Sequence, residues 1–292
     1  MNELARTSQG HALRGALLVL MGATAIQWSA AIVKPAFVSI GPSASSSWRF
    51  LLGAVVLLLL TRPKLRTWSH AQWLGALVLG ATTALMNQAF YQAISRIPLG
   101  SAVAIEYMGP FLVAALAKRS LRHFAFVALA GLGVLALSRP GGGITLIGAL
   151  FAGVAGASWA TYTFASHRVG GNTNGFEGLA VAMAFAALLT CPFGIGATHT
   201  LVSHPSLFAR LLLVGVMATV LGFGFEMQAL RHLKPSIVSV LLALDPAVAF
   251  LIGWLLLHER VTAWDLVGLA CVVLAGIGVT YDAAKEDIKE AL

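Results

Sequence analysis

The sequence predicts an all-α integral membrane protein, and three features of its composition lead to that class. Of its 292 residues, 58% are hydrophobic and 10% are charged, and the mean hydropathy is +0.85. A soluble domain carries about 25% charged residues, so this chain has too few to cover a surface in water. Its apolar residues also form blocks of roughly 18 or more, which is the length of helix that crosses about 30 Å of hydrocarbon.

Glycine and proline divide these apolar blocks into ten expected transmembrane helices joined by short connections. No connection is long enough to form a soluble domain, so we expect a single membrane domain over residues 1–292. The expected helices are 13–33, 43–61, 70–94, 97–117, 122–138, 144–168, 177–197, 206–230, 235–257 and 262–281.

The fourth and ninth expected helices resemble one another. Each opens with a proline, and each carries an acidic residue before an interior proline: Glu106 before Pro110, and Asp245 before Pro246. The alternative explanation is that segments rich in leucine, alanine and glycine are alike by composition alone. Because the acids and prolines recur at equivalent depth, we favour a true internal repeat.

A repeat of five helices has a direct consequence for topology. Five is odd, so the second half crosses the membrane in the opposite sense to the first. Inverted repeats that meet around a central cavity are typical of secondary transporters. We predict a first repeat over 13–138, a second, inverted repeat over 144–281, and a cytoplasmic tail over 282–292.

The distribution of lysine and arginine predicts the orientation. These residues are about twice as frequent in the connections on the side of the two termini, and such residues collect in the cytoplasm. Both termini are therefore expected in the cytoplasm of a bacterial cell, with the chain in the inner membrane. Arg49 and Arg260 are assigned here to the opposite surface. The same bias accounts for the net charge of +8 without a nucleic-acid partner.

Glu106 and Asp245 are the strongest candidate site residues. At 1.5 Å per residue, each lies roughly 14 to 15 Å into its expected helix, near the middle of the membrane. A carboxylate that faces lipid there costs about 2.5–3.5 kcal/mol, so both side chains are expected to face a helix interface or a wet cavity. They then bind a substrate ammonium group or carry a proton, or else they are protonated acids bonded to neighbouring helices.

Pro110 and Pro246 predict helix kinks beside these acids. A proline inside a helix removes the hydrogen bond to the carbonyl four residues earlier, here that of Glu106 or Leu242. A freed carbonyl in a membrane is satisfied by protein or by water in a cavity. The two kinks therefore favour a polar, partly open site.

Further polar and aromatic residues gather in the first, third, sixth and eighth expected helices. Amides and aromatic walls suit a small zwitterion, which needs a few polar contacts and apolar area. Glu226 either lines the cytoplasmic mouth of the path or pairs with Arg231 or His232, and Glu259 is expected to be solvated or to pair with Arg260. The candidates besides the two acids are Trp28, Asn87, Gln88, Tyr91, Tyr107, Trp159, Tyr162 and Glu226, with Gln27 beside Trp28.

Several phrases resemble the drug/metabolite transporter superfamily: Met86-Asn-Gln-Ala-Phe-Tyr-Gln92, the segment 97–110, Gly156-Ala-Ser-Trp-Ala-Thr-Tyr162, Phe225-Glu-Met-Gln-Ala-Leu230, and Leu244-Asp-Pro-Ala247 followed by Glu259. The likeness covers about residues 13–281 and is strongest to the branch of threonine and homoserine exporters, with the aromatic amino-acid exporters next. It implies an exporter of amino acids or related small metabolites. One departure is His258, which stands where this family often has glycine.

Several absences limit the function further. The sequence has no GxxxxGK[ST] segment for ATP and no metal-binding spacing such as HExxH, so no cofactor or metal is expected. The prediction is a secondary-active or facilitative exporter that works by alternating access and is not an enzyme. A polytopic membrane enzyme acting on lipid or peptide, a channel, and an exporter of drugs or other metabolites are the alternatives. Coupling to protons, and whether the protein is a monomer or a homodimer, are left open.

Overall fold

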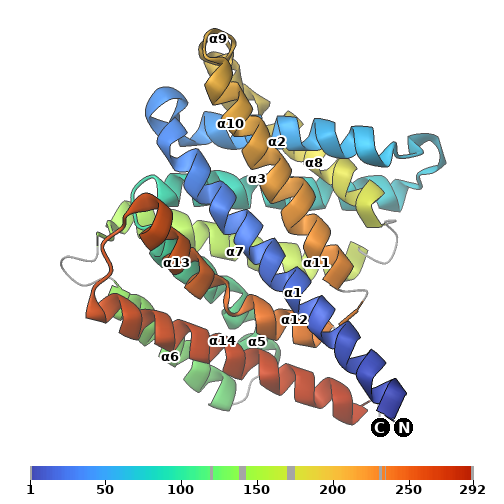
Figure 1. Cartoon of the computed structure of the whole chain (residues 1–292), viewed down its shortest axis with the longest axis vertical. Helices are drawn as coiled ribbons and strands as arrows, with labels where there is room; N and C mark the ends of the chain where they lie inside the picture. The colour runs from blue at the N-terminus through green and yellow to red at the C-terminus, as the bar shows by residue number, and fades with distance from the viewer. Residues whose placement is uncertain are drawn as a thin grey trace.

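The structure is a computed structural model that describes residues 2–118, 121–137, 143–169, 175–229, 232–233 and 235–290. All regular secondary structure in these ranges is helical, as the composition predicts (Figure 1). The first half of the chain forms α1 (Asn2–Val33), α2 (Phe37–Thr61), α3 (His70–Ile94), α4 (Leu99–Glu106), α5 (Met108–Lys118) and α6 (Leu121–Leu137). Short 3-10 turns follow α1 (η1, Lys34–Ala36) and α2 (η2, Leu65–Thr67).

The second half begins with α7 (Leu146–Val169) and α8 (Gly175–Gly194), and a 3-10 turn (η4, Ile195–Ala197) leads into α9 (Thr198–Ser203). A single interrupted helix follows, made of α10 (Pro205–Gly215), the π-helical segment η5 (Val216–Gly222) and α11 (Phe223–Ala229). The chain then forms α12 (Pro235–Leu242), α13 (Asp245–Leu257) and α14 (Ala263–Glu290).

Each expected span coincides with a helix, and three spans are interrupted helices. The span expected at 97–117 consists of α4 and α5, the one at 206–230 contains η5, and the one at 235–257 consists of α12 and α13. The last expected span ends at 281, whereas α14 continues to Glu290, so most of the segment predicted as a tail extends this helix.

The helices have the lengths and the surface of a membrane protein. Within the described residues, four helical segments are long and apolar enough to cross a membrane: Arg14–Thr61, Phe176–Ser203, Pro205–Glu226 and Val240–Leu257. Shorter apolar helices accompany them. Large aliphatic side chains are exposed on many of these helices, among them Leu59, Leu60 and Leu188. An apolar outer surface of this extent belongs in lipid, because in water it would drive aggregation.

The two helix breaks occur beside Pro110 and Pro246, as predicted. The first lies at Tyr107, between α4 and α5, and the second at residues 243–244, between α12 and α13. Proline lacks the N–H that would bond the carbonyl four residues earlier, so the Glu106 carbonyl has no helical partner. A third break is at Gly41 in α2, where φ is +79°, a value that glycine adopts without steric cost.

The freed carbonyl of Glu106 lies directly against α7. A Cβ atom added at Gly156 would lie 2.5 Å from the Glu106 carbonyl oxygen, and one added at Gly109 would collide with the backbone of Gly156. Only glycine allows two helix backbones to approach this closely. The α4–α5 break is therefore held against α7 by two residues without side chains.

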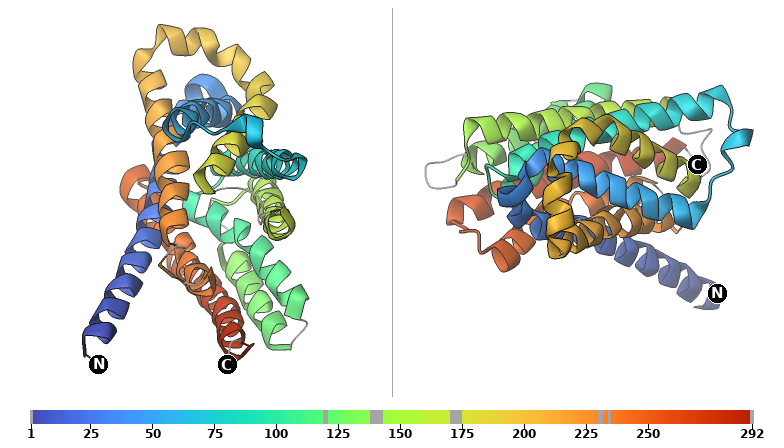
Figure 2. Two further views of the ribbon diagram at one scale, coloured as in Figure 1. Left: turned by 90° about the vertical axis from the view of Figure 1, so that its right-hand side faces the viewer. Right: turned by 90° about the horizontal axis from the view of Figure 1, so that it is seen from above.

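The helices pack in a layered bundle whose core lies among α3, α4 and α13 (Figures 1 and 2). α3 packs on α7 and α8, while the helix of α10, η5 and α11 packs on α1 and α2. α2 also contacts α8, α4 contacts α13, and α6 contacts α14. The first residues of α1 and the end of α14 lie at the same end of the molecule (Figure 2).

Candidate functional site

A cavity of about 240 Å³ lies inside the bundle where the helix breaks meet. Its walls come from both halves of the chain, and they carry three carboxyl groups and one guanidinium group. The residues that line it are Ile26, Gln27, Ala30, Arg49, Thr83, Met86, Asn87, Phe90, Glu106, Tyr107, Trp159, Ala218, Phe223, Glu226, Leu242 and Asp245.

Glu106 is the last residue of α4, so its side chain enters the cavity at the helix break. The residue is buried, yet its carboxyl group makes no hydrogen bond with any residue that the structure describes. The sequence prediction that this acid faces a hollow inside the protein, and not lipid, agrees with this position. A buried acid without a fixed partner is available to a ligand or a proton.

Asp245 is the first residue of α13 and is held by two donors. Gln27 donates from Nε2 to Asp245 Oδ2 over 2.8 Å, and the Tyr107 hydroxyl donates to the same oxygen over 3.2 Å. Its other oxygen, Oδ1, is buried without a partner. The position at a helix N-terminus also favours the negative charge. Asp245 is therefore oriented, with one oxygen left to face a further donor.

Tyr107 connects this acid to the aromatic wall of the cavity. The ring of Tyr107 meets the ring of Trp159 edge to face, with the centroids 4.7 Å apart. Because Tyr107 is the residue at which the helix breaks, the same kink places its hydroxyl on Asp245 and its ring on Trp159. Tyr107 therefore both orients the Asp245 carboxylate and, together with Trp159, forms part of the cavity wall.

Glu226 lies in α11 and also lines the cavity. It therefore lines the cavity, and Arg231, one of its two alternative partners, lies outside the described residues. It reaches the cavity just after the π-helical segment η5, whose Ala218 forms part of the same wall. π-helical turns are frequent at functional sites, because they change the direction in which the following side chains point.

Arg49 is the cavity residue that the sequence analysis placed wrongly. It was assigned to the outer surface, but it lies within α2, twelve residues after Phe37, and its side chain is only 4% exposed. Arg49 Nη2 donates to Asn87 Oδ1 over 2.7 Å, and Nη1 donates to the Tyr91 hydroxyl over 3.3 Å. A charge inside an apolar span indicates a functional site by default, and that signal was present in the sequence.

Asn87 and Tyr91 support Arg49 in different ways. Asn87 lines the cavity, and its amide nitrogen donates to the Thr83 carbonyl over 3.0 Å, which turns its oxygen toward the guanidinium. Tyr91 is fully buried behind Arg49 and does not line the cavity, and its ring lies 5.4 Å from the guanidinium carbon. Of the three candidates predicted on α3, Asn87 therefore lines the cavity and Tyr91 supports Arg49 from behind it.

Two predicted residues lie away from the cavity. Gln88 donates to the Ser43 carbonyl and to the Ser47 hydroxyl, so it joins α3 to α2. Trp28 is 45% exposed on the outside of the bundle. Successive helical residues point about 100° apart, so Trp28 turns outward when its neighbour Gln27 turns inward. The Tyr162 side chain lies outside the described residues.

The remaining lining residues are apolar or weakly polar, and no sequence pattern distinguishes them. They look like ordinary residues of buried helices, and only the meeting of the helices places them on one wall. They are Ile26, Ala30, Thr83, Met86, Phe90, Ala218, Phe223 and Leu242.

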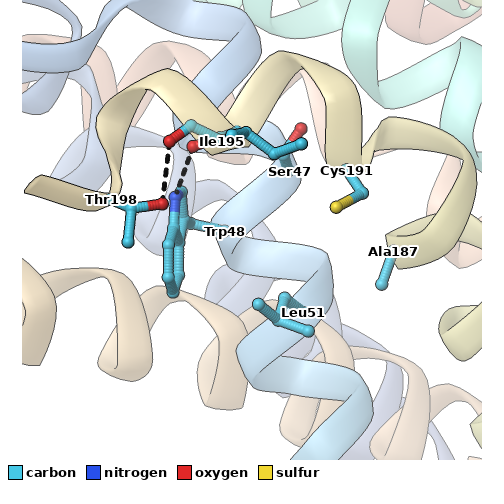
Figure 3. A pocket seen from close by; sticks show the side chains of 8 residues that line it. Ser47, Trp48, Leu51, Ala187, Cys191, Ile195 and Thr198 are labelled. Carbon is cyan, nitrogen blue, oxygen red and sulfur yellow. Dashed lines mark hydrogen bonds between the residues drawn. The ribbon is translucent and has the colours of Figure 1, made fainter.

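A second hollow lies between α2 and α8 and is a weaker candidate (Figure 3). It has a volume of about 190 Å³ and no charged residue in its wall. Trp48 Nε1 donates to the Gly194 carbonyl at its edge over 3.0 Å, and Cys191 is exposed there. In the described residues, no group of three or more histidine, cysteine or acidic side chains is arranged to hold a metal.

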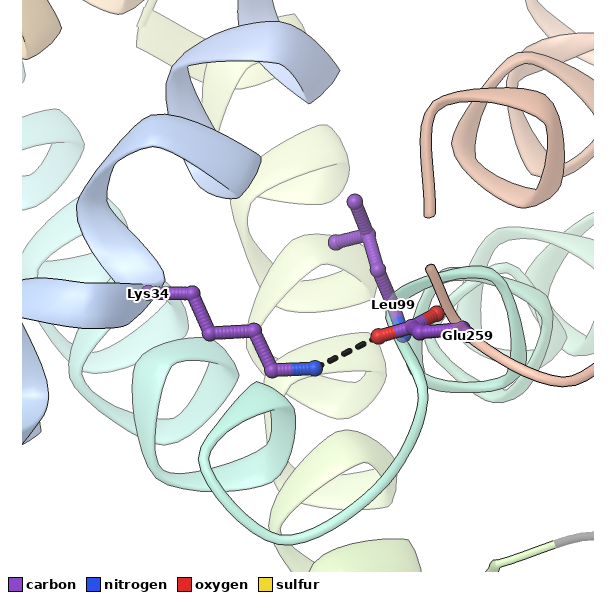
Figure 4. A network of polar contacts seen from close by, with 3 residues as sticks. All are labelled: Lys34, Leu99 and Glu259. Carbon is purple, nitrogen blue, oxygen red and sulfur yellow. Dashed lines mark hydrogen bonds and ion pairs between the residues drawn. The ribbon is translucent and has the colours of Figure 1, made fainter. Parts of the chain in front are cut away.

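A polar network joins the two halves at the end of α1. Lys34 Nζ contacts Glu259 Oε1 at 2.6 Å, and the Leu99 amide donates to both carboxylate oxygens of Glu259 (Figure 4). The expectation that Glu259 is solvated or pairs with Arg260 is therefore wrong. The fold brings Lys34, just after α1, and Leu99, at the start of α4, into contact with Glu259.

An apolar helical bundle that encloses a charged cavity has the form of a membrane transporter, because such residues in a membrane mark the path of a polar substrate. The comparisons with known proteins agree. EamA-like transporters match residues 146–281. The threonine/homoserine exporter RhtA of Escherichia coli (strain K12) is 32% identical over 278 residues, which covers 94% of each chain.

RhtA of Salmonella typhimurium (strain LT2) is 32% identical over 273 residues, which covers 92% of each chain. A solved crystal structure that covers 92% of this chain and 98% of its own is 18% identical, with a TM-score of 0.59, and shares the fold. The chain therefore belongs to the EamA-like family of drug/metabolite transporters, together with the threonine/homoserine exporters. It is an exporter of amino acids or related metabolites.

Proposed function

We propose that this protein exports a small amino acid of the threonine or homoserine kind across the bacterial inner membrane, and that the charged cavity is its substrate site. The supporting observation is that both halves contribute acids to one buried cavity, Glu106 from the first and Asp245 and Glu226 from the second. The similarity to exporters of threonine and homoserine supports the substrate class. The relatives are named as exporters, which supports transport without chemical change, and we infer that the protein is not an enzyme.

In this proposal the acids receive the ammonium group of the substrate. Asp245 has one buried carboxylate oxygen, Oδ1, without a partner, and Glu106 adds a carboxyl group without a hydrogen bond in the described residues to the wall of the same cavity. Tyr107 and Trp159 form an aromatic wall, and Glu226 lies where the path continues along α11. Gln88 and Tyr91 act indirectly, because they hold α3 and Arg49 in place.

The packing pattern supports ten transmembrane helices in two inverted repeats. Suppose that each helix of the first half corresponds to one helix of the second half. The packing of α3 on α7 and α8 then corresponds to the packing of the α10–α11 helix on α1 and α2. Three further contacts, α2 with α8, α4 with α13 and α6 with α14, join corresponding helices, as expected about a two-fold axis.

Two further observations support the repeat boundaries at 13–138 and 144–281. The broken helices begin with pieces of equal length, since α4 and α12 each have eight residues before the break. The EamA-like match at 146–281 also begins and ends close to the second predicted repeat. We infer a single membrane domain made of two such halves.

Alternating access then requires one side of the cavity to close while the other opens. The Lys34–Glu259 ion pair joins the end of α1 to the end of α13, and the Leu99 amide adds the start of α4. With both termini in the cytoplasm, this network lies at the outer side. We propose that it closes the outer side in the state described here.

Counterflow of labelled threonine into proteoliposomes that contain the purified protein tests the export function. We expect uptake that saturates and that is accelerated by threonine or homoserine inside. Uptake that does not saturate indicates a channel, and the absence of uptake for every amino acid rejects the proposal. Repeating the assay with an imposed pH gradient decides whether protons are coupled, because uncoupled transport ignores the gradient.

A further inference from the structure

The cavity contains one positive group, the guanidinium of Arg49, on the side formed by α2 and α3. Its two terminal nitrogens bond to the neutral side chains of Asn87 and Tyr91, and its Nε is buried without a partner. No acid lies within ion-pair distance of Arg49 in the part of the chain that the structure describes. Arg49 is thus a buried cation with no bonded counter-charge.

A buried cation is unfavourable unless an anion or further hydrogen-bond acceptors compensate its charge. An isolated charge out of water costs far more than a hydrogen-bonded neutral group, and buried charges are normally paired. The cavity acids are too far away to pair directly, although they share the same space. Asp245 has its own free oxygen, and Glu106 has no bonded partner. The cavity therefore has a positive group and negative groups at different places in its wall.

A free amino acid has the matching distribution of charge. Its carboxylate and its ammonium group are opposite charges at adjacent positions, and each needs a partner when it leaves water. The guanidinium is a planar fork of N–H donors that fits a carboxylate, and its Nε side is the part without a partner. The acids accept hydrogen bonds from an ammonium group in the same way.

We propose that Arg49 binds the α-carboxylate of the transported amino acid, while Asp245 and Glu106 bind its ammonium group. This assignment rests on the proposed export function and deepens it, because it makes the unblocked zwitterion the required substrate. The side chain of the substrate then lies against the wall of Met86 and Trp159. Amino-acid amides and simple amines, which lack the carboxylate, are excluded.

The alternative for Arg49 is a purely structural role. Its guanidinium also stacks near the rings of Phe50 and Tyr91, at 5.0 and 5.4 Å from their centroids. In that role Arg49 holds α2 against α3, and its removal weakens the binding of all ligands by the same factor. The two roles therefore differ in ligand discrimination, which does not depend on the overall stability of the protein.

The first experiment uses the purified wild-type protein and needs no substitution. Binding of threonine, threonine amide and the amine left by decarboxylation of threonine is measured by calorimetry in detergent micelles. We expect the amide and the amine to bind about 10- to 100-fold more weakly than threonine, because each leaves the buried guanidinium unpaired. Equal binding of all three overturns the assignment and leaves the export function intact. If none of the three compounds binds, both the assignment of Arg49 and the export function are rejected.

The second experiment assigns the discrimination to Arg49. In Arg49→Gln, threonine and its amide should bind within a few-fold of each other. Arg49→Lys should keep part of the preference, since it retains the charge but loses the fork. The control Arg210→Gln removes an exposed cation from α10 and should keep the full preference. Full discrimination in Arg49→Gln overturns the assignment. If that variant fails to fold, a full wild-type preference retained by Arg49→Lys overturns it instead, because the lysine lacks the guanidinium fork.

Discussion

Replacing Asp245 by asparagine tests the central role of the cavity acids. The substitution keeps the shape of the side chain and one oxygen that accepts hydrogen bonds from Gln27 and Tyr107, which now lie 2.8 and 3.2 Å from Oδ2. It removes the negative charge and puts an N–H₂ group in place of one oxygen. The fold should therefore persist, and the loss should fall on the ligand.

The size of the effect follows from the contact that is lost. A hydrogen bond to a charged group contributes about 1.5–3 kcal/mol, which corresponds to about 10- to 100-fold in affinity. The amide of Asp245→Asn also points a donor at the ammonium group, so we expect the upper part of this range. The concentration of threonine that half-saturates counterflow measures the change.

Asp265 supplies a matched control for this experiment. It is also a buried aspartate, but it lies in the first turn of α14, where its carboxylate accepts from the Thr262 amide at 2.7 Å and hydroxyl at 2.8 Å. Asp265→Asn should cost stability at a helix end and leave the half-saturating concentration unchanged. Unchanged affinity in a folded Asp245→Asn protein, or equal losses in both variants, would refute the role given to Asp245.

Three further predictions concern the fold and the outer closure. Gly156→Ala places a methyl group against the Glu106 carbonyl and should cost about 1–3 kcal/mol, whereas Gly153→Ala meets open space, so the two midpoints of thermal unfolding should differ. His258 has a φ of 52°, a value that is strained for every residue except glycine. His258→Gly should therefore raise the midpoint of thermal unfolding by an amount equivalent to about 1 kcal/mol, and a lower midpoint contradicts this. Lys34→Gln removes the Lys34–Glu259 ion pair, so in a chain whose cavity wall carries the substitution Thr83→Cys, an impermeant thiol reagent added outside should label that cysteine faster. An unchanged labelling rate contradicts the outer closure.

The position of His258 also explains a feature of the sequence. It ends α13 in the left-handed conformation that helices commonly use at this point, usually with glycine. The resemblance to the transporter superfamily expects glycine here, and the backbone of this chain has kept the glycine conformation with a histidine. The departure therefore changes the strain at the helix end and not its geometry.

The helices and their breaks could be predicted because their causes are local. Composition and block length determine that the chain is a helical membrane protein, and the missing N–H of Pro110 and Pro246 determines where two helices break. Glu106 and Asp245 could be expected to face the protein interior because a carboxylate facing lipid is expensive wherever it lies along a span, and both line the cavity. None of these arguments requires the position of another helix.

The errors have a different origin. Arg49 was placed at a surface because its distance from the true start of α2 was not known, and Trp28 was placed in the cavity because Gln27 belongs there. Glu259 was expected to pair with Arg260, its neighbour in the sequence, but it forms its ion pair with Lys34. In each case the missing information was the direction in which a helix face points and which helix it meets.

The sequence by itself determined the class of the protein, the helices, the two breaks and the presence of acids within apolar helices, because these depend on short stretches of chain and on the cost of burying charge. Only the tertiary structure decided that the acids share a cavity with Arg49 and that Lys34 meets Glu259. The reason is that contacts between residues far apart in the chain depend on how helices rotate and cross, and an apolar helix in lipid carries little periodic pattern to record it.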